Sequence, residues 1–138
     1  MYYIDIVQFR EGCFLISLNL TGNNPIHEQI TDGVEDLIIR GLLEKDSPLP
    51  SVRELACSLA VNPNTVQKAY TTLEQKGITY SVNGKGRFVA VSKEELKVLL
   101  AAAVSEELGA SVRKLKAYGF SVSDIGAYVK KFFEEDRK

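Results

Sequence analysis

The sequence predicts an α+β fold that is mainly α-helical. Apolar residues recur at helical spacing in several segments, and two stretches rich in β-branched and aromatic residues are divided by short glycine-containing turns. The apolar fraction of 45% and the charged fraction of 25% are typical of a globular domain. A chain of 138 residues is expected to hold one core of roughly 100–150 residues with at most a small appendage.

The N-terminal segment, residues 1–23, is expected to be extended. Residues 2–9 and 14–20 are rich in β-branched and aromatic side chains and are separated by a turn at residues 10–12. These two runs can pair as a hairpin, although periodicity alone does not settle it. The chain begins without a basic stretch and carries Asp5 early, so a secretory signal is not expected.

Residues 25–43 are expected to form an amphipathic helix. Asn24 is its expected N-cap and Pro25 its expected first helical residue. The apolar face consists of Ile26, Ile30, Val34, Leu37, Ile38 and Leu42. The prolines at positions 48 and 50 end any helix before the next element.

Two short helices joined by a tight turn are expected next. Ser51-x-x-Glu54 is a capping box, and Asn62 followed by Pro63 is a second cap. The turn between the two helices covers residues 60–62. The inward faces consist of Val52, Leu55, Ala56 and Leu59 in the first helix and Val66, Ala69, Tyr70 and Leu73 in the second.

A β-hairpin follows the second of these helices, which is expected to end near Gly77. Residues 78–82 and 87–91 are the expected strands, and residues 83–86 form the turn. A helix, a helix-turn-helix and a β-hairpin in this order make a winged helix-turn-helix domain, which we assign to residues 24–91.

Residues 92–138 are expected to form two further helices. Capping boxes at Ser92-x-x-Glu95 and Ser121-x-x-Asp124 begin them, and Gly109 marks a point where the first can kink. The last helix carries an apolar stripe of Ile125, Tyr128, Val129, Phe132 and Phe133. Such a stripe needs a partner surface.

The net charge of -1 conceals an uneven distribution. Residues 1–39 hold one base and six acids, whereas residues 40–90 hold seven bases and four acids. Residues 91–138 carry nine bases and eight acids. The middle segment, with a net charge of +3, is therefore the expected footprint of a polyanion. An excess of this size also arises by chance, so charge alone does not decide.

The outward face of the second helix of the pair carries side chains suited to duplex DNA: Asn64, Thr65, Gln67, Lys68, Thr71 and Gln75. When such a helix enters the major groove, its early positions reach base edges, where Asn and Gln favour adenine and Lys favours guanine. Arg53, at the start of the preceding helix, can reach phosphate or guanine. The alternatives are a merely solvated helix face and, for Arg53, a surface ion pair with Glu54 or a neighbouring acid.

The tip of the predicted hairpin combines glycine and positive charge. Gly84 and Gly86 permit close approach to a phosphodiester backbone, and Lys85 and Arg87 can lie on or in the minor groove. A generic hairpin turn with solubilising charges is the alternative.

An enzyme or a metal centre finds no support in the pattern. His27, Cys13 and Cys57 are far apart in sequence, and no carboxylate pair accompanies a nucleophile. We therefore expect no catalytic residues, metal or cofactor, and a structural role for His27. Two cysteines make no disulfide framework, and no run approaches the ~20 apolar residues of a membrane span. A cytoplasmic protein without a membrane partner is expected.

Four blocks of the sequence resemble the GntR-type bacterial transcription regulators. In order, they are Pro25-Ile26-x-Glu28-Gln29-Ile30, Leu49-Pro50-Ser51-x-Arg53-x-Leu55-Ala56, Thr65-Val66-x-x-Ala69-Tyr70-x-x-Leu73-Glu74-x-x-Gly77 and Gly84-x-Gly86-x-Phe88-Val89. The resemblance covers residues 25–90 without gaps. Because only 48 residues follow position 90, the chain resembles the small YtrA-like subfamily, in which a short helical tail supplies dimerisation.

The resemblance implies a homodimeric DNA-binding repressor, often of neighbouring transporter genes. The family's DNA contacts fall on Ser51, Arg53, Asn64, Thr65, Gln67, Lys68, Gly84, Lys85 and Gly86 of this chain. His27 stands where the family usually has an aromatic residue, Asn64 where a base is common, and Arg87 where a small hydroxyl residue is frequent. Residues 1–15 lie outside the resemblance.

We therefore expect a symmetric dimer, held by the C-terminal helices, whose recognition helices enter successive major grooves of a pseudo-palindromic operator. Its half-sites would lie about 34 Å apart. The alternative is a winged helix that binds protein without specific DNA contact, although such a face is expected to be more apolar than residues 64–68. No feature of the sequence identifies a small-molecule effector.

Overall fold

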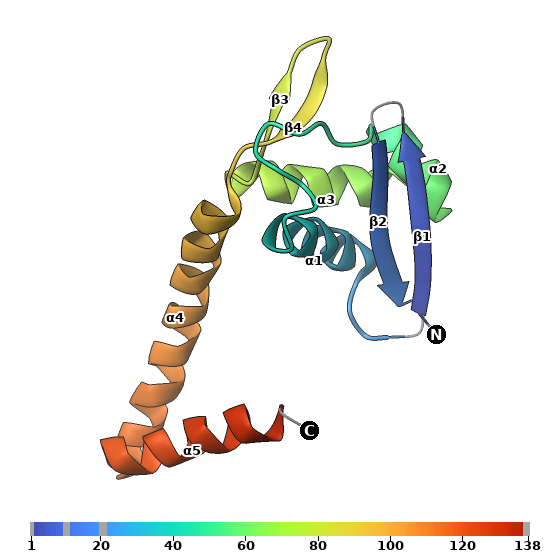
Figure 1. The fold of residues 1–138 in the computed structure, drawn as a ribbon. Coiled ribbons are helices and arrows are strands. Elements are labelled where there is room, and N and C mark those ends of the chain that lie inside the picture. The colour runs from blue at the N-terminus through green and yellow to red at the C-terminus, as the bar shows by residue number, and fades with distance from the viewer. Residues whose placement is uncertain (1, 10–11, 20–21, 137–138) are drawn as a thin grey trace. The chain divides into compact units, whose positions relative to one another are not determined.

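The computed structural model describes residues 2–9, 12–19 and 22–136. The described chain divides into two compact units, residues 1–97 and residues 98–138. Its elements are, in order, β1 (Tyr2–Phe9), β2 (Gly12–Asn19), α1 (Ile26–Ile39), α2 (Val52–Leu59), α3 (Pro63–Gln75), β3 (Thr79–Val82), β4 (Gly86–Val89), α4 (Lys93–Ala117) and α5 (Val122–Glu135). The predicted class, α+β and mainly α, is confirmed (Figure 1).

Helices α1, α2 and α3 enclose the core of the first unit. The side chains with no exposed surface come from the predicted inward faces, from the segment after α3 and from the start of α4: Ile30, Val34, Ile38, Leu55, Val66, Ala69, Tyr70, Leu73, Ile78, Val89 and Leu96. The prediction for the end of α1 is wrong, because the helix stops at Ile39 rather than at residue 43. Leu42 consequently lies outside the helix with 60% of its surface exposed, and Leu43 is buried in its place.

The start of α1 also differs from the prediction. Pro25, not Asn24, is the N-cap, and no side chain caps the helix there. The Gln29 side chain instead joins α1 to the end of β2. Its Nε2 donates to the carbonyls of Asn19 and Asn24 at 2.9 and 2.7 Å, and its Oε1 accepts from the Asn19 N–H at 2.6 Å. The carbonyl of Asn24 thereby accepts from a side chain five residues further along the chain, a contact that capping rules do not include.

The N-terminal segment forms an antiparallel hairpin, with Tyr2 opposite Asn19 and Phe9 opposite Gly12. Strand β2 starts at Gly12, two residues before the predicted position. Ile16 and Leu18 of β2 are buried, and a Cβ at Gly33 would lie 3.2 Å from Cγ2 of Ile16. The absence of a side chain at Gly33 therefore lets α1 approach β2 closely. The side chain of Cys13 lies outside what the structure describes.

Strands β3 and β4 form the second hairpin, with Thr79 opposite Val89 and Val82 opposite Gly86; we call residues 79–89 the wing. Residues 46–49 lie along the outer edge of β4. The hydrogen bonds run from Asp46 N to Val89 O, from Val89 N to Ser47 O and from Leu49 N to Arg87 O, at 2.8, 2.9 and 2.9 Å. A helix stop was the only prediction for this segment, because proline weakens any strand pattern.

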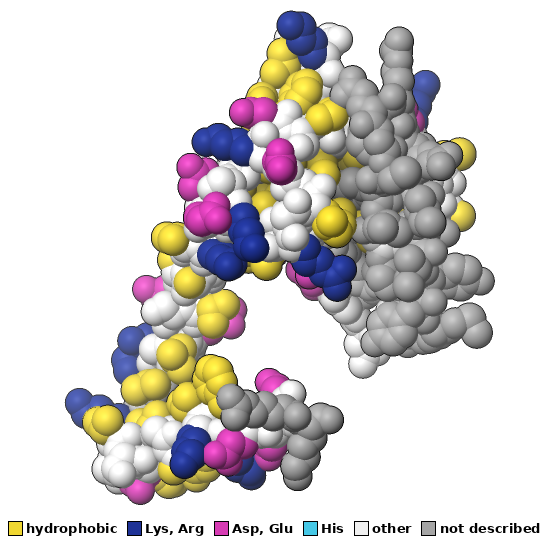
Figure 2. Space-filling view, in the orientation of Figure 1, with side chains coloured by type: hydrophobic (Ala, Val, Ile, Leu, Met, Phe, Trp, Pro, Cys, Tyr) yellow, Lys and Arg dark blue, Asp and Glu magenta, His cyan; other side chains and the backbone are white. Residues whose placement is uncertain are grey.

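The two C-terminal helices begin at the predicted capping boxes. The Glu95 N–H donates to Ser92 Oγ at 3.1 Å, and the Asp124 N–H donates to Ser121 Oγ at 3.2 Å. Helix α4 is continuous through Gly109. None of the side chains of α5 is buried, and Figure 2 shows hydrophobic side chains on the surface of α4 and α5. In the described part of the chain, no helix is long and apolar enough to cross a membrane.

Candidate nucleic-acid interface

The helix-turn-helix is fixed at both of its helix starts by short polar side chains. Ser51 Oγ accepts from the Glu54 N–H at 3.1 Å, and Glu54 Oε2 accepts from the Ser51 N–H at 2.8 Å. The turn passes through Ala60, whose φ of 54° is left-handed. Asn62 Oδ1 then accepts from the Asn64 N–H at 2.8 Å, which begins α3. These local bonds set the direction in which α3 leaves the turn.

The inner face of α3 is anchored by Tyr70. Its ring is fully buried, and its hydroxyl donates to the carbonyl of Pro50 at 2.7 Å. Burial raises the pKa of Tyr70, so the hydroxyl keeps the proton that it donates. The bond holds α3 against the residue that precedes the Ser51 cap, and the opposite face of α3 is thereby turned outward.

The outward face of α3 presents the polar side chains predicted from the sequence. Asn64, Gln67 and Lys68 are exposed and Thr65 is half-buried. Gln67 Nε2 donates to Thr71 Oγ1 at 3.2 Å. Within the described residues, the side chains of Asn64 and Lys68 make no hydrogen bond or ion pair, so their donors and acceptors are available to an incoming ligand.

Arg53 lies on the same unit and is exposed. The alternative considered from the sequence, an ion pair with Glu54, does not form, because the Glu54 carboxylate accepts from the Ser51 N–H. The guanidinium pairs with no acid in the part of the chain that the structure covers. The structure therefore leaves Arg53 free to contact a phosphate or a base edge.

The tip of the wing is shaped by glycine. Gly84 and Gly86 have φ values of 76° and 110°, a region that residues with a side chain rarely adopt. An added Cβ would meet nothing within 4 Å at either position, so the glycines serve the turn and leave its surface open. Lys85 lies between them, exposed and without a side-chain partner among the described residues. Figure 2 shows a basic side chain at the tip of the wing.

The sequence predicted that Arg87 lies with Lys85 at the tip of the wing. In the structure, the Arg87 side chain points elsewhere. Its Nη1 lies 3.5 Å from Oε2 of Glu74 in α3, and its Cζ lies 5.4 Å from the centroid of the Tyr70 ring. The guanidinium is therefore directed back toward the recognition helix. The structure thus brings Lys85, but not the charged end of Arg87, to the predicted phosphate-binding tip.

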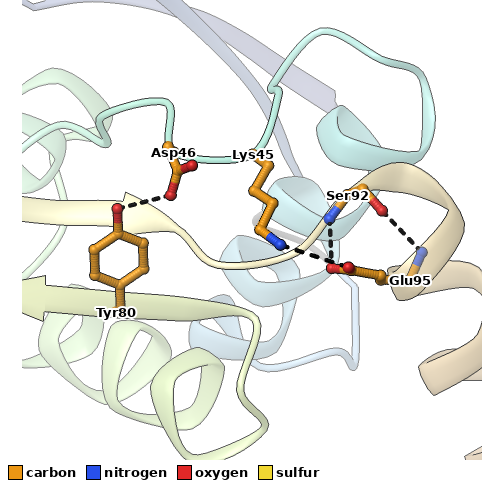
Figure 3. Close-up of polar contacts among 5 residues, drawn as sticks. All are labelled: Lys45, Asp46, Tyr80, Ser92 and Glu95. Carbon is orange, nitrogen blue, oxygen red and sulfur yellow. Dashed lines mark hydrogen bonds and ion pairs between the residues drawn. The ribbon is translucent and has the colours of Figure 1, made fainter.

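The base of the wing is held by a polar network that sequence reasoning missed (Figure 3). Tyr80 donates to Asp46 Oδ1 at 2.8 Å, and this hydrogen bond raises the pKa of Tyr80. Lys45 Nζ lies 3.5 Å from Oε1 of Glu95 at the start of α4. The hydrogen bond from the Ser92 N–H lowers the pKa of Glu95, and the charge of Lys45 acts in the same direction. The Tyr80–Asp46 and Lys45–Glu95 contacts join positions too far apart in sequence for a motif to reveal them, whereas the bond between Ser92 and Glu95 belongs to the predicted capping box.

No metal-binding arrangement is found among residues 2–9, 12–19 and 22–136. No group of three or more His, Cys, Asp or Glu side chains in these ranges could hold an ion. Cys57 is a free, exposed thiol. The first unit presents the polar face of α3, Arg53 in the first turn of α2 and Lys85 on the glycine turn of the wing. These side chains can bind phosphates and base edges.

Comparison with known proteins identifies relatives along most of the chain. Residues 26–89 match the bacterial regulatory proteins of the gntR family. The chain is 33% identical to the HTH-type transcriptional repressor YtrA of Bacillus subtilis (strain 168), over 84% of this chain and 95% of that protein. A GntR family transcriptional regulator from Listeria monocytogenes has a structure with a TM-score of 0.61 and 33% identity, covering 81% of this chain and 98% of that one. The structure of YtrA from Sulfolobus acidocaldarius has a TM-score of 0.52 and 36% identity, covering 65% of this chain and 97% of that one.

Proposed function

The chain belongs to the gntR family of bacterial regulatory proteins, and from that membership we propose that it acts as a homodimeric repressor of a pseudo-palindromic DNA operator. It is a DNA-binding transcriptional regulator and not an enzyme. The proposal has five parts: the dimer, the symmetry of the operator, the role as a repressor, the cytoplasmic location and the contact residues. Repression follows if occupation of a promoter blocks polymerase, and YtrA of Bacillus subtilis is named a repressor.

The observation that carries the proposal is a set of exposed polar side chains on α2, α3 and the wing that make no hydrogen bond or ion pair within the described residues: Arg53, Asn64, Lys68 and Lys85. In the proposed complex, α3 enters the major groove and the tip of the wing lies along the minor groove. The proposed contacts are Ser51, Arg53, Asn64, Thr65, Gln67, Lys68, Gly84, Lys85 and Gly86. Asn64 and Lys68 read base edges, Arg53 reads a guanine or a phosphate, and Lys85 contacts phosphate.

The proposed dimer uses the apolar face of the C-terminal unit. Phe132 and Phe133 of α5 are 63% and 75% exposed, which is costly for a lone helix in water. Basic residues beside them are paired within the helix, with Lys130 Nζ 3.9 Å from Glu134 Oε1 and Lys131 Nζ 3.8 Å from Glu135 Oε1. A second copy of this nearly neutral helix can therefore approach without charge repulsion. A two-fold dimer also matches a two-fold operator.

Substitution of the free cations tests the interface. Arg53→Ala is expected to weaken operator binding by about 1–3 kcal/mol if the side chain reads a guanine, and Lys68→Ala is expected to weaken it as well. Fluorescence anisotropy with a duplex that the wild-type chain enriches from a random pool measures both. Arg40→Ala is the matched control, because it removes a basic side chain that pairs with Asp36 outside the proposed contacts. Binding unchanged by both test substitutions would contradict the assignment.

The alternative of a protein-interaction module makes a different prediction for salt. A chain that neutralises phosphates releases counterions, so the logarithm of its affinity falls linearly with the logarithm of salt concentration. A wild-type affinity for duplex DNA that is negligible at low salt would favour the protein-interaction module instead.

A further inference from the structure

Arg87 lies opposite Ser81 in the wing, one residue pair before the turn, and its side chain is largely enclosed. Only 20% of its side chain is exposed, and its nearest acid is Glu74 in α3. The guanidinium carbon lies 5.4 Å from the centre of the Tyr70 ring, within the range of a cation–π contact. Both partners belong to the recognition helix, whereas Arg87 belongs to β4. The side chain therefore joins the wing to α3.

The main chain of Arg87 makes a second connection. The Arg87 carbonyl accepts from the Leu49 N–H at 2.9 Å. Pro50, the residue after Leu49, accepts from the Tyr70 hydroxyl through its own carbonyl. Residues 49–50 lead directly into the Ser51 cap of α2. Arg87 thus contacts or closely adjoins all three elements that carry the proposed DNA contacts: α2, α3 and the wing.

We propose that Arg87 is a positioning residue, which, paired with Glu74 and stacked on Tyr70, fixes the wing at the separation from α3 that one duplex requires. The inference rests on the proposed DNA contacts and replaces a direct phosphate contact by Arg87. Two surfaces that must bind the same rigid ligand gain affinity when their separation is fixed beforehand, because less freedom is lost on binding. The pair supplies this restraint to Lys85 and to the outward face of α3.

Glu74 separates this role from a direct phosphate contact by the sign of its effect. If Arg87 bound phosphate, Glu74→Gln would release the guanidinium, remove a negative charge from the interface and tighten DNA binding. If Arg87 positions the wing, the same substitution breaks the restraint and weakens binding. Glutamine has nearly the same size as glutamate, so the substitution changes the charge of the side chain and not its volume.

The binding experiment uses full-length variants and a duplex enriched by the wild-type chain from a random pool. Glu74→Gln is expected to raise Kd about two- to fivefold, the size expected of a partly exposed ion pair. Arg87→Ala is expected to raise Kd about tenfold, because the stacking on Tyr70 is lost as well. Arg87→Lys keeps the charge pair and should fall between wild type and Arg87→Ala. Glu44→Gln is the matched control, since it removes an exposed carboxylate without an ion pair in the described chain.

A second readout needs no DNA. Amide hydrogen exchange across residues 79–89 should be faster in Glu74→Gln and Arg87→Ala than in wild type, and unchanged in Glu44→Gln. Equal or tighter DNA binding by Glu74→Gln, or unchanged exchange of the wing, would overturn the positioning role. A wild-type chain that binds no duplex would instead overturn the proposed contacts, while the exchange rates would still show whether the pair restrains the wing.

Discussion

The two units differ in how far they bury their apolar side chains. Helix α4 shows the difference most clearly, because its two ends belong to different units. Leu96, in the first unit, is fully buried, whereas Leu108, in the second, is 55% exposed. The first unit buries the apolar faces of α1, α2 and α3 within the chain, and the outward face of α3 is polar. In the second unit, none of the side chains of residues 98–136 is buried. The contrast supports the proposed division of labour, in which one unit recognises DNA and the other joins two copies.

Removal of residues 120–138 is the strongest test of this contrast. The truncated chain is expected to sediment as a monomer, because it lacks the exposed aromatic side chains of α5. Its operator affinity should fall by about 100-fold or more, since two half-sites can no longer be bound together. Sedimentation velocity and anisotropy measure the two effects. A truncated chain that remains dimeric would show that α5 does not form the seam.

Paired substitutions in α4 sharpen the contrast within one helix. Leu96→Ala is expected to lower the free energy of unfolding by about 2–5 kcal/mol, because it opens a cavity in the core. Leu108→Ala should change it by less than about 0.5 kcal/mol when the protein is dilute enough to be monomeric. Urea denaturation at several protein concentrations measures both. Equal losses in the dilute protein would mean that Leu108 is packed within the chain.

The two units are also expected to respond to acid in opposite directions, with a smaller effect. Burial raises the pKa of Glu35 in α1 despite its contact with Lys76. The fold therefore favours the protonated acid, and this contribution is present below the ordinary value of 4.5 and lost as pH rises through the raised pKa. The hydrogen bond from the Ser121 N–H lowers the pKa of Asp124. Its contribution is present above 3.8 and lost as pH falls through the lowered pKa.

Amide exchange between about pH 7 and pH 3, corrected for the intrinsic rates, separates these responses. Acid should speed exchange at the first turn of α5 and not where α1 meets α3. Glu35→Gln should remove the pH dependence where α1 meets α3, and Asp124→Asn should remove it at the first turn of α5. A pH response of the same sign at both sites would contradict the assignment of the two carboxyl groups.

The predictable parts of the fold depend on neighbours in sequence. The capping boxes at Ser51, Ser92 and Ser121 join residues three apart, and the structure contains all three of them. The inward face of α3 follows equally from its helical spacing. Apolar periodicity failed at the end of α1, because Leu42 has the right spacing but follows the last helical residue, Ile39.

The parts that the sequence did not predict join distant residues. Gln29 bonds the end of β2, Lys45 reaches α4, and Arg87 turns from the tip of the wing toward Glu74. A charged residue beside a glycine turn indicates a phosphate contact only if its side chain points outward, and this orientation depends on which acid lies within reach in the folded chain. For the interface, the sequence therefore predicted the residue types, and the structure decided which charges are free.

Selection of DNA from a random pool by the full-length chain, followed by sequencing, tests the central claim most directly. A dimer that presents two copies of α3 predicts an enriched motif with two-fold symmetry and half-sites about one helical turn apart, roughly 34 Å. Arg53→Ala should relax the preference at one position in each half-site. An enriched pool with a single asymmetric half-site, or with no motif, would contradict the account of a symmetric operator-binding dimer.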